Sequence, residues 1–406
     1  MLRSLDRDHA SSLDESDPLA GFRERFIVDP SAVYLDGNSL GCLPRATVDR
    51  LADVVSAQWG LRGIRGWTEG WMEMPETIGD ELGAAALGAA PGQVAIGDST
   101  TVCLYKLFSA ALDARPGRSE IVTDVDNFPT DRYVLEGLAA ARGLSIVWLR
   151  GDPDGGPSVE EVAAAVGERT ALVTFSHVSY RSAHIADMAG ISRAARDAGA
   201  LVVWDLCHSA GSVPVALDAD GADLAAGCTY KYLNAGPGAP AFIYVRRELQ
   251  EQLRQPIWGW LGRRDPFEMA PGYEPAAGIR AFLSGTPPVL ALTAVAEGVR
   301  LVAEAGIESI RAKGNELTEL AIALIDERLD GLGARVASPR DARVRGAHVA
   351  LAHPDAPALS RALLERGVIV DFRRPDVIRL GLSPLTTRFV DVWDGVEAVR
   401  ELLTGA

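Results

Sequence analysis

The stretch ALVVWDLCHSAG, residues 200–211, decides the fold class. Its first half is an apolar run long enough for one buried strand, and the run ends in Asp205, with His208 three residues later. In open α/β sheets, ligands bind at the carboxyl ends of the strands, so both side chains are placed to face a ligand. The other interpretation is that Asp205 caps the following helix and that His208 packs in the core.

Short β-rich runs alternate with helical patterns on both sides of this stretch. Strands are predicted at residues 93–97, 120–123, 145–149, 171–175, 201–205 and 241–245. Amphipathic helices are predicted between several of them, for example over residues 104–112 and 187–198, where apolar side chains recur at helical spacing. The alternation predicts an α/β fold with a mainly parallel sheet flanked by helices.

The pattern changes after about residue 288. A long helical region at 289–329 precedes a strand at 348–352, a helix at 356–366, strands at 368–371 and 377–381, and a last helix at 390–403. We therefore predict an N-terminal arm (1–45), a large domain (46–288) and a smaller α+β domain (289–406). The polar start of the arm has no signal-peptide core and is expected to fray. Residues 256–288, rich in Pro and Gly, are expected to form a functional loop.

Composition excludes several classes of protein. The chain has 406 residues, 48% of them hydrophobic, and a net charge of −15, which argues against a nucleic-acid-binding surface or a polybasic membrane patch. It contains no apolar run of the roughly 20 residues that a membrane span requires. The four scattered cysteines suggest neither a zinc knuckle nor a disulfide framework, and the six dispersed histidines suggest no metal site. We expect a cytoplasmic globular enzyme.

Lysine is rare in this chain. Of 40 basic residues only Lys106, Lys231 and Lys313 are lysines, and an amine that can lose its proton is what arginine cannot supply. Lys231 lies in ADLAAGCTYKYLNAGPG, residues 222–238, about one strand-and-crossover unit after Asp205. A lysine and an aspartate at neighbouring strand ends can hold pyridoxal 5′-phosphate (PLP). The lysine forms a Schiff base with the aldehyde, and the carboxylate keeps the pyridine nitrogen protonated. A lysine between two tyrosines can instead simply snorkel.

Two further segments suit such a cofactor. GDSTTVC, residues 97–103, follows a strand and opens a helix, so Thr100 and Thr101 can help to bind a phosphate, although Ser and Thr are also ordinary helix caps. NFPTD, residues 127–131, follows another strand and offers Phe128 as a flat face for a planar ring. Taken alone, this second segment is only a turn.

One motif competes with this interpretation. GNSLG, residues 37–41, matches the G-x-S-x-G nucleophile elbow of serine hydrolases and lies between an expected strand and a helix. An elbow normally sits within an established sheet, whereas this motif precedes every other strand. Asp205 and His208 are also too close together to serve as separate arms of a triad. A serine hydrolase is therefore the less favoured alternative.

Together, these segments resemble the kynureninase family, PLP enzymes of the aspartate-aminotransferase-like fold, from about residue 33 to the C-terminal helix. The matching segments are YLDGNSLG, NFPTD, WDLCHSAG, GCTYKYLN, YEPAAGIRAFLSGT and IRLGLSPL. The resemblance implies the seven-stranded large domain of PLP-transferases and hydrolytic cleavage of the Cβ–Cγ bond of L-kynurenine to anthranilate and L-alanine. It places the reaction in tryptophan catabolism or in NAD or secondary-metabolite biosynthesis. The lysine segment alone would also fit a cysteine desulfurase or an aminotransferase, but no cysteine lies in residues 256–288, where a desulfurase needs one.

By position, the resemblance implies that Lys231, Tyr230 and Asp205 are catalytic. Lys231 would carry the cofactor, Asp205 would hold the pyridine nitrogen and Tyr230 would donate a proton to the substrate β-carbon. The remaining cofactor-binding positions would be Thr100, Thr101, Phe128, Thr130, Asp131, Ser176, His208, Trp260 and Thr286. Trp260 and Thr286 match positions that reach the cofactor phosphate across a homodimer interface.

The resemblance also implies the substrate contacts. Arg379 matches the arginine that binds the substrate carboxylate, and Ser39 and Trp67 match positions near the substrate. Trp67 and Thr286 stand where animal members that prefer 3-hydroxykynurenine have histidine and asparagine, so we expect a preference for L-kynurenine. Three positions depart from the family pattern and bear on fine substrate choice: Cys103, Ser179 and Thr386.

Overall fold

The computed structural model describes residues 5–405, and seven of its strands form one central sheet. In spatial order these are β4 (Val94–Ile96), β10 (Phe242–Val245), β9 (Leu224–Gly227), β8 (Leu201–Asp205), β7 (Thr170–Ser176), β5 (Glu120–Asp124) and β6 (Ser145–Leu149). From β6 to β9 all neighbours are parallel, and only β10 runs antiparallel to both of its neighbours. The predicted mainly parallel sheet is thus confirmed. Strand β9 was not predicted, because its Leu-Ala-Ala-Gly run lacks β-branched residues.

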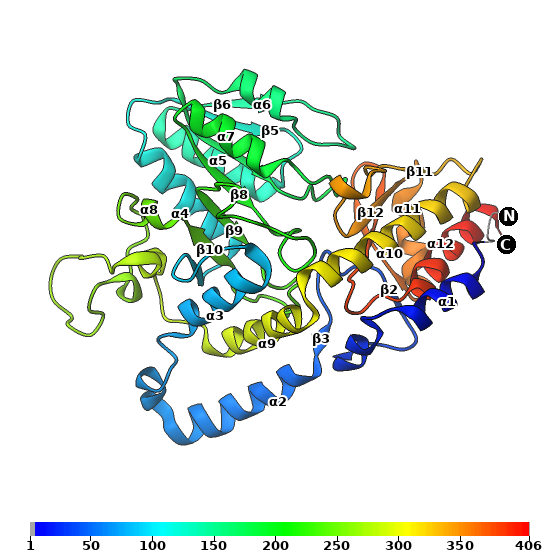
Figure 1. The fold of residues 1–406 in the computed structure, drawn as a ribbon, viewed down its shortest axis with the longest axis horizontal. Helices are drawn as coiled ribbons and strands as arrows, with labels where there is room; N and C mark the ends of the chain where they lie inside the picture. Colours follow the sequence, from blue (N-terminus) through cyan, green and yellow to red (C-terminus); the bar gives the residue numbers. More distant parts are fainter. Residues whose placement is uncertain (1–4, 406) are drawn as a thin grey trace.

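Helices cover both faces of this sheet (Figure 1). Side chains of β8 alternate, so that Val202 and Trp204 enter one core and Leu201 and Val203 enter the other. The first core is covered by α3 (Met74–Leu82), α6 (Val159–Ala165), α7 (Met188–Asp197) and α9 (Val289–Ala305), and the second by α4 (Thr100–Asp113) and α5 (Pro129–Arg142). Burial on both faces explains why these strands are continuous apolar runs.

Three helix N-termini lie at the carboxyl edge of the sheet, and two of them have side-chain caps. The Ser99 hydroxyl caps α4 by accepting from the backbone N–H of Val102, and the Asp187 carboxylate caps α7 in the same way. α5 begins with Pro129 in its first turn and ends at Gly143, whose φ of 67° suits glycine. Because α4, α5 and α7 follow β4, β5 and β7, their first turns lie where the strands end.

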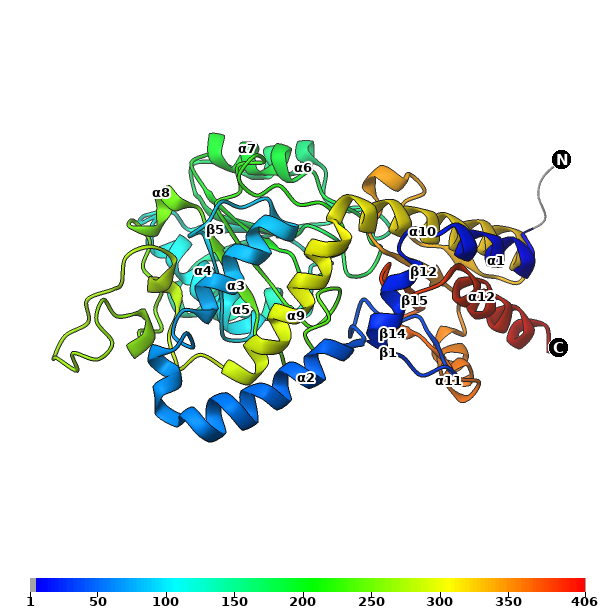
Figure 2. The ribbon, with the colours of Figure 1, turned by 60° about the horizontal axis from the view of Figure 1, so that its bottom comes forward.

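A smaller antiparallel sheet lies at the end of the molecule that holds both chain termini (Figures 1 and 2). Its order is β11 (Arg335–Val336), β12 (His348–Ala352), β15 (Val377–Gly381) and β14 (Asp371–Arg373). It packs with α10 (Ile307–Arg328), α11 (Ala356–Glu365) and α12 (Phe389–Thr404). The single helical region predicted at 289–329 is two helices, because Gly306 adopts a φ of 77° between α9 and α10.

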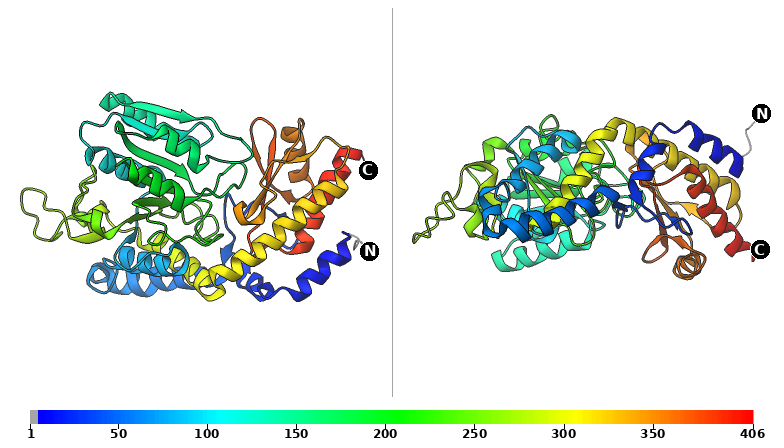
Figure 3. Two further views of the ribbon diagram at one scale, coloured as in Figure 1. Left: turned by 45° about the horizontal axis from the view of Figure 1, so that its top comes forward. Right: turned by 90° about the horizontal axis from the view of Figure 1, so that it is seen from below.

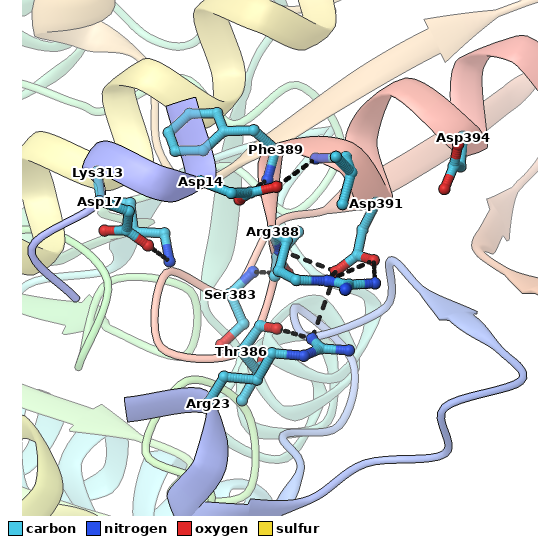
Figure 4. Close-up of polar contacts among 12 residues, drawn as sticks. Asp14, Asp17, Arg23, Lys313, Ser383, Thr386, Arg388, Phe389, Asp391 and Asp394 are labelled. Atoms are coloured by element: carbon cyan, nitrogen blue, oxygen red, sulfur yellow. Dashed lines mark hydrogen bonds and ion pairs between the residues drawn. The ribbon is translucent and has the colours of Figure 1, made fainter. Parts of the chain in front are cut away.

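The N-terminal segment packs on the helices that cover this smaller sheet rather than fraying. Helix α1 (Arg7–Ser16) lies along α12, and the Asp14 carboxylate accepts from the N–H groups of Phe389 (2.7 Å) and Val390 (3.1 Å) at its start (Figure 4). Lys313 pairs with Asp17 at 2.6 Å. The expectation of a frayed arm is therefore wrong for residues 5–17, while residues 1–4 lie outside the described residues.

The rest of the arm crosses toward the large sheet. β2 (Val33–Tyr34) pairs in parallel with β13 (Val368–Ile369), and β1 (Phe26–Ile27) pairs with β3 (Leu43–Pro44), after which α2 (Arg45–Asp53) follows. The remaining helical segments are short 3-10 or π-helical stretches and one α-helical turn: η1 (Ala20–Arg25), η2 (Val54–Arg62), η3 (Gly63–Thr68), η4 (Gly83–Leu87), α8 (Arg247–Gln250), η5 (Trp260–Gly262), η6 (Gly278–Phe282) and η7 (Ala342–Val344). Part of the segment between α8 and α9 projects from the end opposite the termini (Figure 3).

The boundary at residue 288 stays a prediction. Helix α9 contributes Leu292, Val295 and Val299 to the core of the large sheet, which favours a boundary nearer the α9–α10 junction. Within residues 5–405, no helix combines the length and the apolar character that a membrane span needs.

Candidate active site

The carboxyl ends of β7, β8 and β9 bring the predicted polar residues together. Parallel register pairs Ser176 with Asp205 and Asp205 with Ala226, and the chain continues from β9 into the loop that carries Lys231. The Ser176 hydroxyl lies 3.1 Å from the Asp205 carboxylate, and Lys231 Nζ lies 3.3 Å from His208 Nε2. The sheet topology thus gathers an acid, a hydroxyl, an imidazole and an amine at one edge.

His208 is neutral in this arrangement. Its side chain is buried, and burial first, then the charge of Lys231, holds the pKa of the imidazole well below its usual value. A neutral ring can accept a hydrogen bond from the Lys231 amine through Nε2. The Lys231 amine itself is buried, about 6 Å from the ring centres of Phe128 (5.7 Å) and Tyr230 (6.0 Å).

Asp131 lies at the start of α5 with an unsatisfied carboxyl group. It is 1% exposed, and one of its carboxyl oxygens has no hydrogen-bond partner among the described residues. Burial first, and then the negative charge of Asp205, raises the pKa of Asp131 well above its usual value. A buried acceptor of this kind normally has a partner, so the site has room for a ligand that donates a hydrogen bond. Thr130 precedes Asp131 in the first turn of α5.

A cavity of about 490 Å³ opens at the N-terminus of α4. Thr100, Thr101 and Tyr230 line it, together with Thr286 from the segment before α9. The first-turn N–H groups of a helix and two threonine hydroxyls suit a phosphate. Thr286 therefore reaches this cavity within a single chain.

Arg379 projects from the smaller sheet and is 1% exposed. Its guanidinium donates to the carbonyl of Tyr180 (2.7 Å) and the hydroxyl of Ser39 (3.1 Å), and it forms an ion pair with Asp371. Burial lowers its pKa to about 10, so it keeps its charge at neutral pH. A buried, charged guanidinium suits a carboxylate ligand.

The GNSLG turn is a packing turn in this fold, not a nucleophile elbow. The Ser39 hydroxyl donates to Asp371 and accepts from Arg379, and within residues 5–405 no histidine is among its hydrogen-bond partners that could activate it. Gly41 donates its N–H to the carbonyl of Tyr230 at 2.8 Å, and a Cβ at position 41 would overlap the carbonyl oxygen of Lys231. The turn needs glycine there because two backbones touch.

Trp67 and Trp260 lie together in a separate aromatic cluster. Their rings are 6.4 Å apart, and Trp71 and Phe267 pack against them at 5.2 and 5.8 Å respectively. Neither tryptophan lines the cavity that Thr100 and Tyr230 border. The other predicted site residues lie in two neighbouring regions, the carboxyl edge of the large sheet and the surroundings of Arg379. Trp67 and Trp260 lie apart from both within the single chain.

Comparisons with known proteins bear on both fold and chemistry. Residues 310–399 match the kynureninase C-terminal domain family. Curated kynureninases from Burkholderia pseudomallei and Pseudomonas fluorescens are 44% and 41% identical to this chain, each over 98% of it and 95% of the relative.

The chain belongs to the kynureninase family. Kynureninases are PLP-dependent hydrolases, and this chain is one. The resemblance seen in the motifs is confirmed, and the relatives favour it over the desulfurase, aminotransferase and serine-hydrolase alternatives.

Solved structures confirm the fold class. The cysteine desulfurase of Thermococcus onnurineus NA1 matches with a TM-score of 0.83 at 19% identity, over 95% of this chain and 98% of that one. The C-DES structure with glycine covalently linked to its PLP cofactor gives 0.82 at 17%, over 93% and 99%. At such identities the likeness concerns the fold alone.

The residues of this kynureninase fit PLP. Asp131 offers an unpartnered carboxyl oxygen as a hydrogen-bond acceptor, and Lys231 offers a buried amine as a nucleophile. The cavity lined by the threonines of α4 offers an anion-binding site in the same region. Asp205 adds the buried carboxylate.

Sequence reasoning missed two members of the site. Asn127 accepts from Ser176 at 2.9 Å, and Asp371 holds Arg379. Asn127 opens the quoted NFPTD segment, so its position at a strand end was a usable signal. Asp371 gave none, because its link to Arg379 depends on the pairing of β14 with β15.

The three residues that depart from the family pattern have different surroundings. Cys103 is buried with its thiol on the Gly97 carbonyl at 3.2 Å, and the Thr386 carbonyl accepts from Arg23. Ser179 lines a small cleft with Ser176 and Tyr180, so it is the departure nearest the site.

Proposed function

We propose that this kynureninase binds PLP through Lys231, with Asp205 at the pyridine nitrogen, and hydrolyses L-kynurenine to anthranilate and L-alanine. The observation that carries the assignment is the contact of the Lys231 amine with neutral His208. Lys231 follows β9, the parallel neighbour of β8, and β8 ends at Asp205. Phe128, Thr130, Asp131, Ser176 and His208 would surround the ring, with Thr100 and Thr101 at the phosphate.

The chain's own residues account for the proton transfers. PLP, when bound, supplies an electron sink for the substrate Cα. The Lys231 amine takes the Cα proton, and neutral His208 beside it keeps that amine from facing a second cation. Burial raises the pKa of Tyr230, so its hydroxyl stays protonated and can donate to the β-carbon as the Cβ–Cγ bond breaks. Water adds to the aryl ketone.

Substrate orientation falls to the smaller sheet. Arg379 would bind the α-carboxylate with Ser39 beside it, which fixes the amine toward Lys231. Kynurenine alone should therefore yield fluorescent anthranilate and alanine. Dependence on a keto acid, or sulfide release from cysteine at a comparable rate, would refute the substrate assignment.

Reduction with borohydride tests the lysine. The purified protein should be yellow, and borohydride should fix the cofactor to the peptide that contains Lys231. Lys106 and Lys313 are internal controls, because both are buried in ion pairs with aspartates. Labelling of either control, or no chromophore after PLP is added, would overturn the proposal.

We propose further that two chains share their sites in a homodimer. Six large apolar side chains that are more than half exposed come from the η2–η3 region and the segment before α9: Trp59, Leu61, Ile64, Trp258, Phe267 and Met269. One of them, Phe267, packs against Trp260 of the Trp67–Trp260 cluster, which lies apart from its own chain's cavity. Burial of such a patch against a second copy would remove it from water and deliver both tryptophans to the partner's site.

Mixing two inactive variants tests this sharing. A Lys231→Ala chain and a Trp260→Ala chain, unfolded and refolded together, should recover about one quarter of wild-type activity, since half of the random dimers would hold one intact site. No recovery, or full activity of a species with the mass of a single 43.1 kDa chain, would refute shared sites. Leu61→Asp should favour the monomer, whereas Leu364→Asp, an exposed leucine on α11, should not.

The substrate preference rests on Trp67 and Thr286. Trp67 offers a flat apolar wall whose single polar atom is a donor, so an added ring hydroxyl gains little. We expect a higher kcat/KM for L-kynurenine than for 3-hydroxykynurenine, and Trp67→His with Thr286→Asn should narrow or reverse the ratio. A wild-type preference for the hydroxylated substrate, or an unchanged ratio in the double variant, would show that the ratio is set elsewhere.

Cytoplasmic location stays a prediction.

A further inference from the structure

Two cysteines meet where β8 and β9 end. Asp205 on β8 is paired in register with Ala226 on β9. Cys207 lies two residues after Asp205, and Cys228 lies two residues after Ala226. The Cys228 N–H donates to Cys207 Sγ at 3.3 Å, and the Cys228 thiol donates to the Cys207 carbonyl at 3.7 Å. Neighbouring strands are roughly 4.7–4.9 Å apart, which lies within the Cα separation that a disulfide spans. Both thiols are free.

This pair adjoins two groups of the proposed site. The Cys207 N–H donates to the Asp205 carboxylate at 2.8 Å, and Cys228 lies two residues before Tyr230 in the loop that carries Lys231. Burial raises the pKa of Cys228, but the hydrogen bond from Cys207 and the charge of Lys231 outweigh it and the pKa is lowered. The hydrogen bond to Cys228, and then burial, raises the pKa of the Cys207 thiol well above its usual value, so Cys228 is the more readily ionised of the two. The proposed mechanism uses neither thiol.

We propose that Cys207 and Cys228 are a redox pair that a peroxide converts to an intrachain disulfide, switching the active site off. The Cys228 thiolate attacks one peroxide oxygen and becomes a sulfenic acid, releasing one water after protonation. The Cys207 sulfur then attacks the sulfenic sulfur, the S–S bond forms and a second water leaves. The two sulfurs lose two electrons, and the peroxide gains them.

The new bond would disturb the site through these two connections. It ties the Cys228 backbone, two residues before Tyr230, to the Cys207 backbone, whose N–H holds Asp205. A displacement of ~1 Å in a catalytic arrangement costs about 10²-fold in rate, so we expect a loss of that order. The effect on activity rests on the proposed roles of Asp205 and Tyr230, whereas formation of the bond does not.

The test treats the holoenzyme with hydrogen peroxide, blocks free thiols and maps peptides by mass spectrometry. We expect a Cys207–Cys228 linked peptide, a parallel loss of activity and of the cofactor's native absorbance, and recovery of both with dithiothreitol. Cys207→Ser or Cys228→Ser should prevent the reversible loss. Cys103→Ser is the matched control, because that thiol is also buried but, among the described residues, bonds only to the Gly97 carbonyl, and it should leave the loss intact.

Three results would overturn the proposal. One is the absence of the linked peptide in the wild-type protein. Another is a linked peptide formed with activity and absorbance unchanged. The third is equal reversible loss in a folded Cys228→Ser variant. If the serine variants do not fold, the wild-type peptide map and its reversal still decide. Absence of the linked peptide in a protein that still carries PLP at Lys231 would separate failure of the switch from failure of the proposed function.

Discussion

Gly41→Ala tests how the GNSLG turn holds the proposed cofactor lysine. A Cβ at position 41 would overlap the carbonyl oxygen of Lys231 and lie 2.9 Å from the Cα of Asn234, inside the 3.0 Å that real Cβ atoms keep. The Gly41 N–H also donates to the Tyr230 carbonyl at 2.8 Å, so the two backbones cannot separate without losing that bond. The substitution must therefore displace the loop that carries Lys231.

The size of the effect follows from that displacement. Overlap with a carbonyl requires a shift of several tenths of an ångström, and misplacement by ~1 Å at a catalytic group costs about 10²-fold in rate. Forcing a methyl group into packed backbone also lowers the free energy of unfolding by about 1–3 kcal/mol. We expect kcat to fall by about 10- to 10²-fold in a protein that still folds.

The assay compares kcat, cofactor absorbance and thermal unfolding of Gly41→Ala with those of Gly137→Ala. Gly137 lies exposed inside α5, and a methyl group added there would meet no atom within 4 Å. Alanine at position 137 should therefore raise stability by about 0.5–1 kcal/mol and leave kcat unchanged. A Gly41→Ala enzyme with wild-type kcat and absorbance would refute the reasoning, because the close approach would then not fix the position of Lys231.

Three further predictions concern charge. Arg379→Lys should raise KM for kynurenine by about 10- to 10²-fold, since an ammonium cannot bind a carboxylate through two parallel hydrogen bonds; an unchanged KM would show that the carboxylate binds elsewhere. Burial, and then Asp126, raises the pKa of Asp124 to about 6, so the folded chain holds that proton more tightly and stability falls as pH rises from about 4 to about 6. Asp124→Asn should therefore stabilise the protein by up to about 3 kcal/mol above pH 6 but not below pH 4, as thermal melts at both pH values would reveal. Lys313→Met should lower the free energy of unfolding by about 3–5 kcal/mol, because it leaves the buried Asp17 carboxylate without its ion-pair partner. Adding Asp17→Asn to the same chain should restore most of the lost stability. Urea melts in which the two losses simply add would contradict this expectation.

Local pattern was enough for every strand of the large sheet except β9, and for the chemistry at the sheet edge. The strands at 145–149, 201–205, 348–352 and 377–381 have the predicted bounds, because continuous apolar runs and alternation report burial directly. Asp205 and Lys231 follow consecutive parallel strands, so topology alone puts them at one edge. The break at Gly306 was missed because glycine within a helical pattern does not by itself predict a positive φ.

The structure shows a defined environment for each of the three lysines, which the sequence alone did not reveal. All three lysines are buried, but Lys106 and Lys313 are paired with Asp98 and Asp17 at 2.6 Å each. Only Lys231 is free of a carboxylate partner among the described ion pairs, and it contacts a neutral imidazole instead. An ion pair with a residue far along the chain leaves no mark in local composition.

By itself, then, the sequence determined the parallel sheet, the strand-end acid and lysine, and the family. Tertiary structure alone decided that Ser39 and Asp371 hold Arg379, that Gly41 touches the backbone of Lys231, and that Cys207 meets Cys228. The physical reason is the range of the interactions. Periodicity and strand-end position follow from burial and backbone geometry within a few residues. Contacts between distant segments are chosen by how two sheets and an N-terminal segment pack, and many sequences with the same local pattern pack differently.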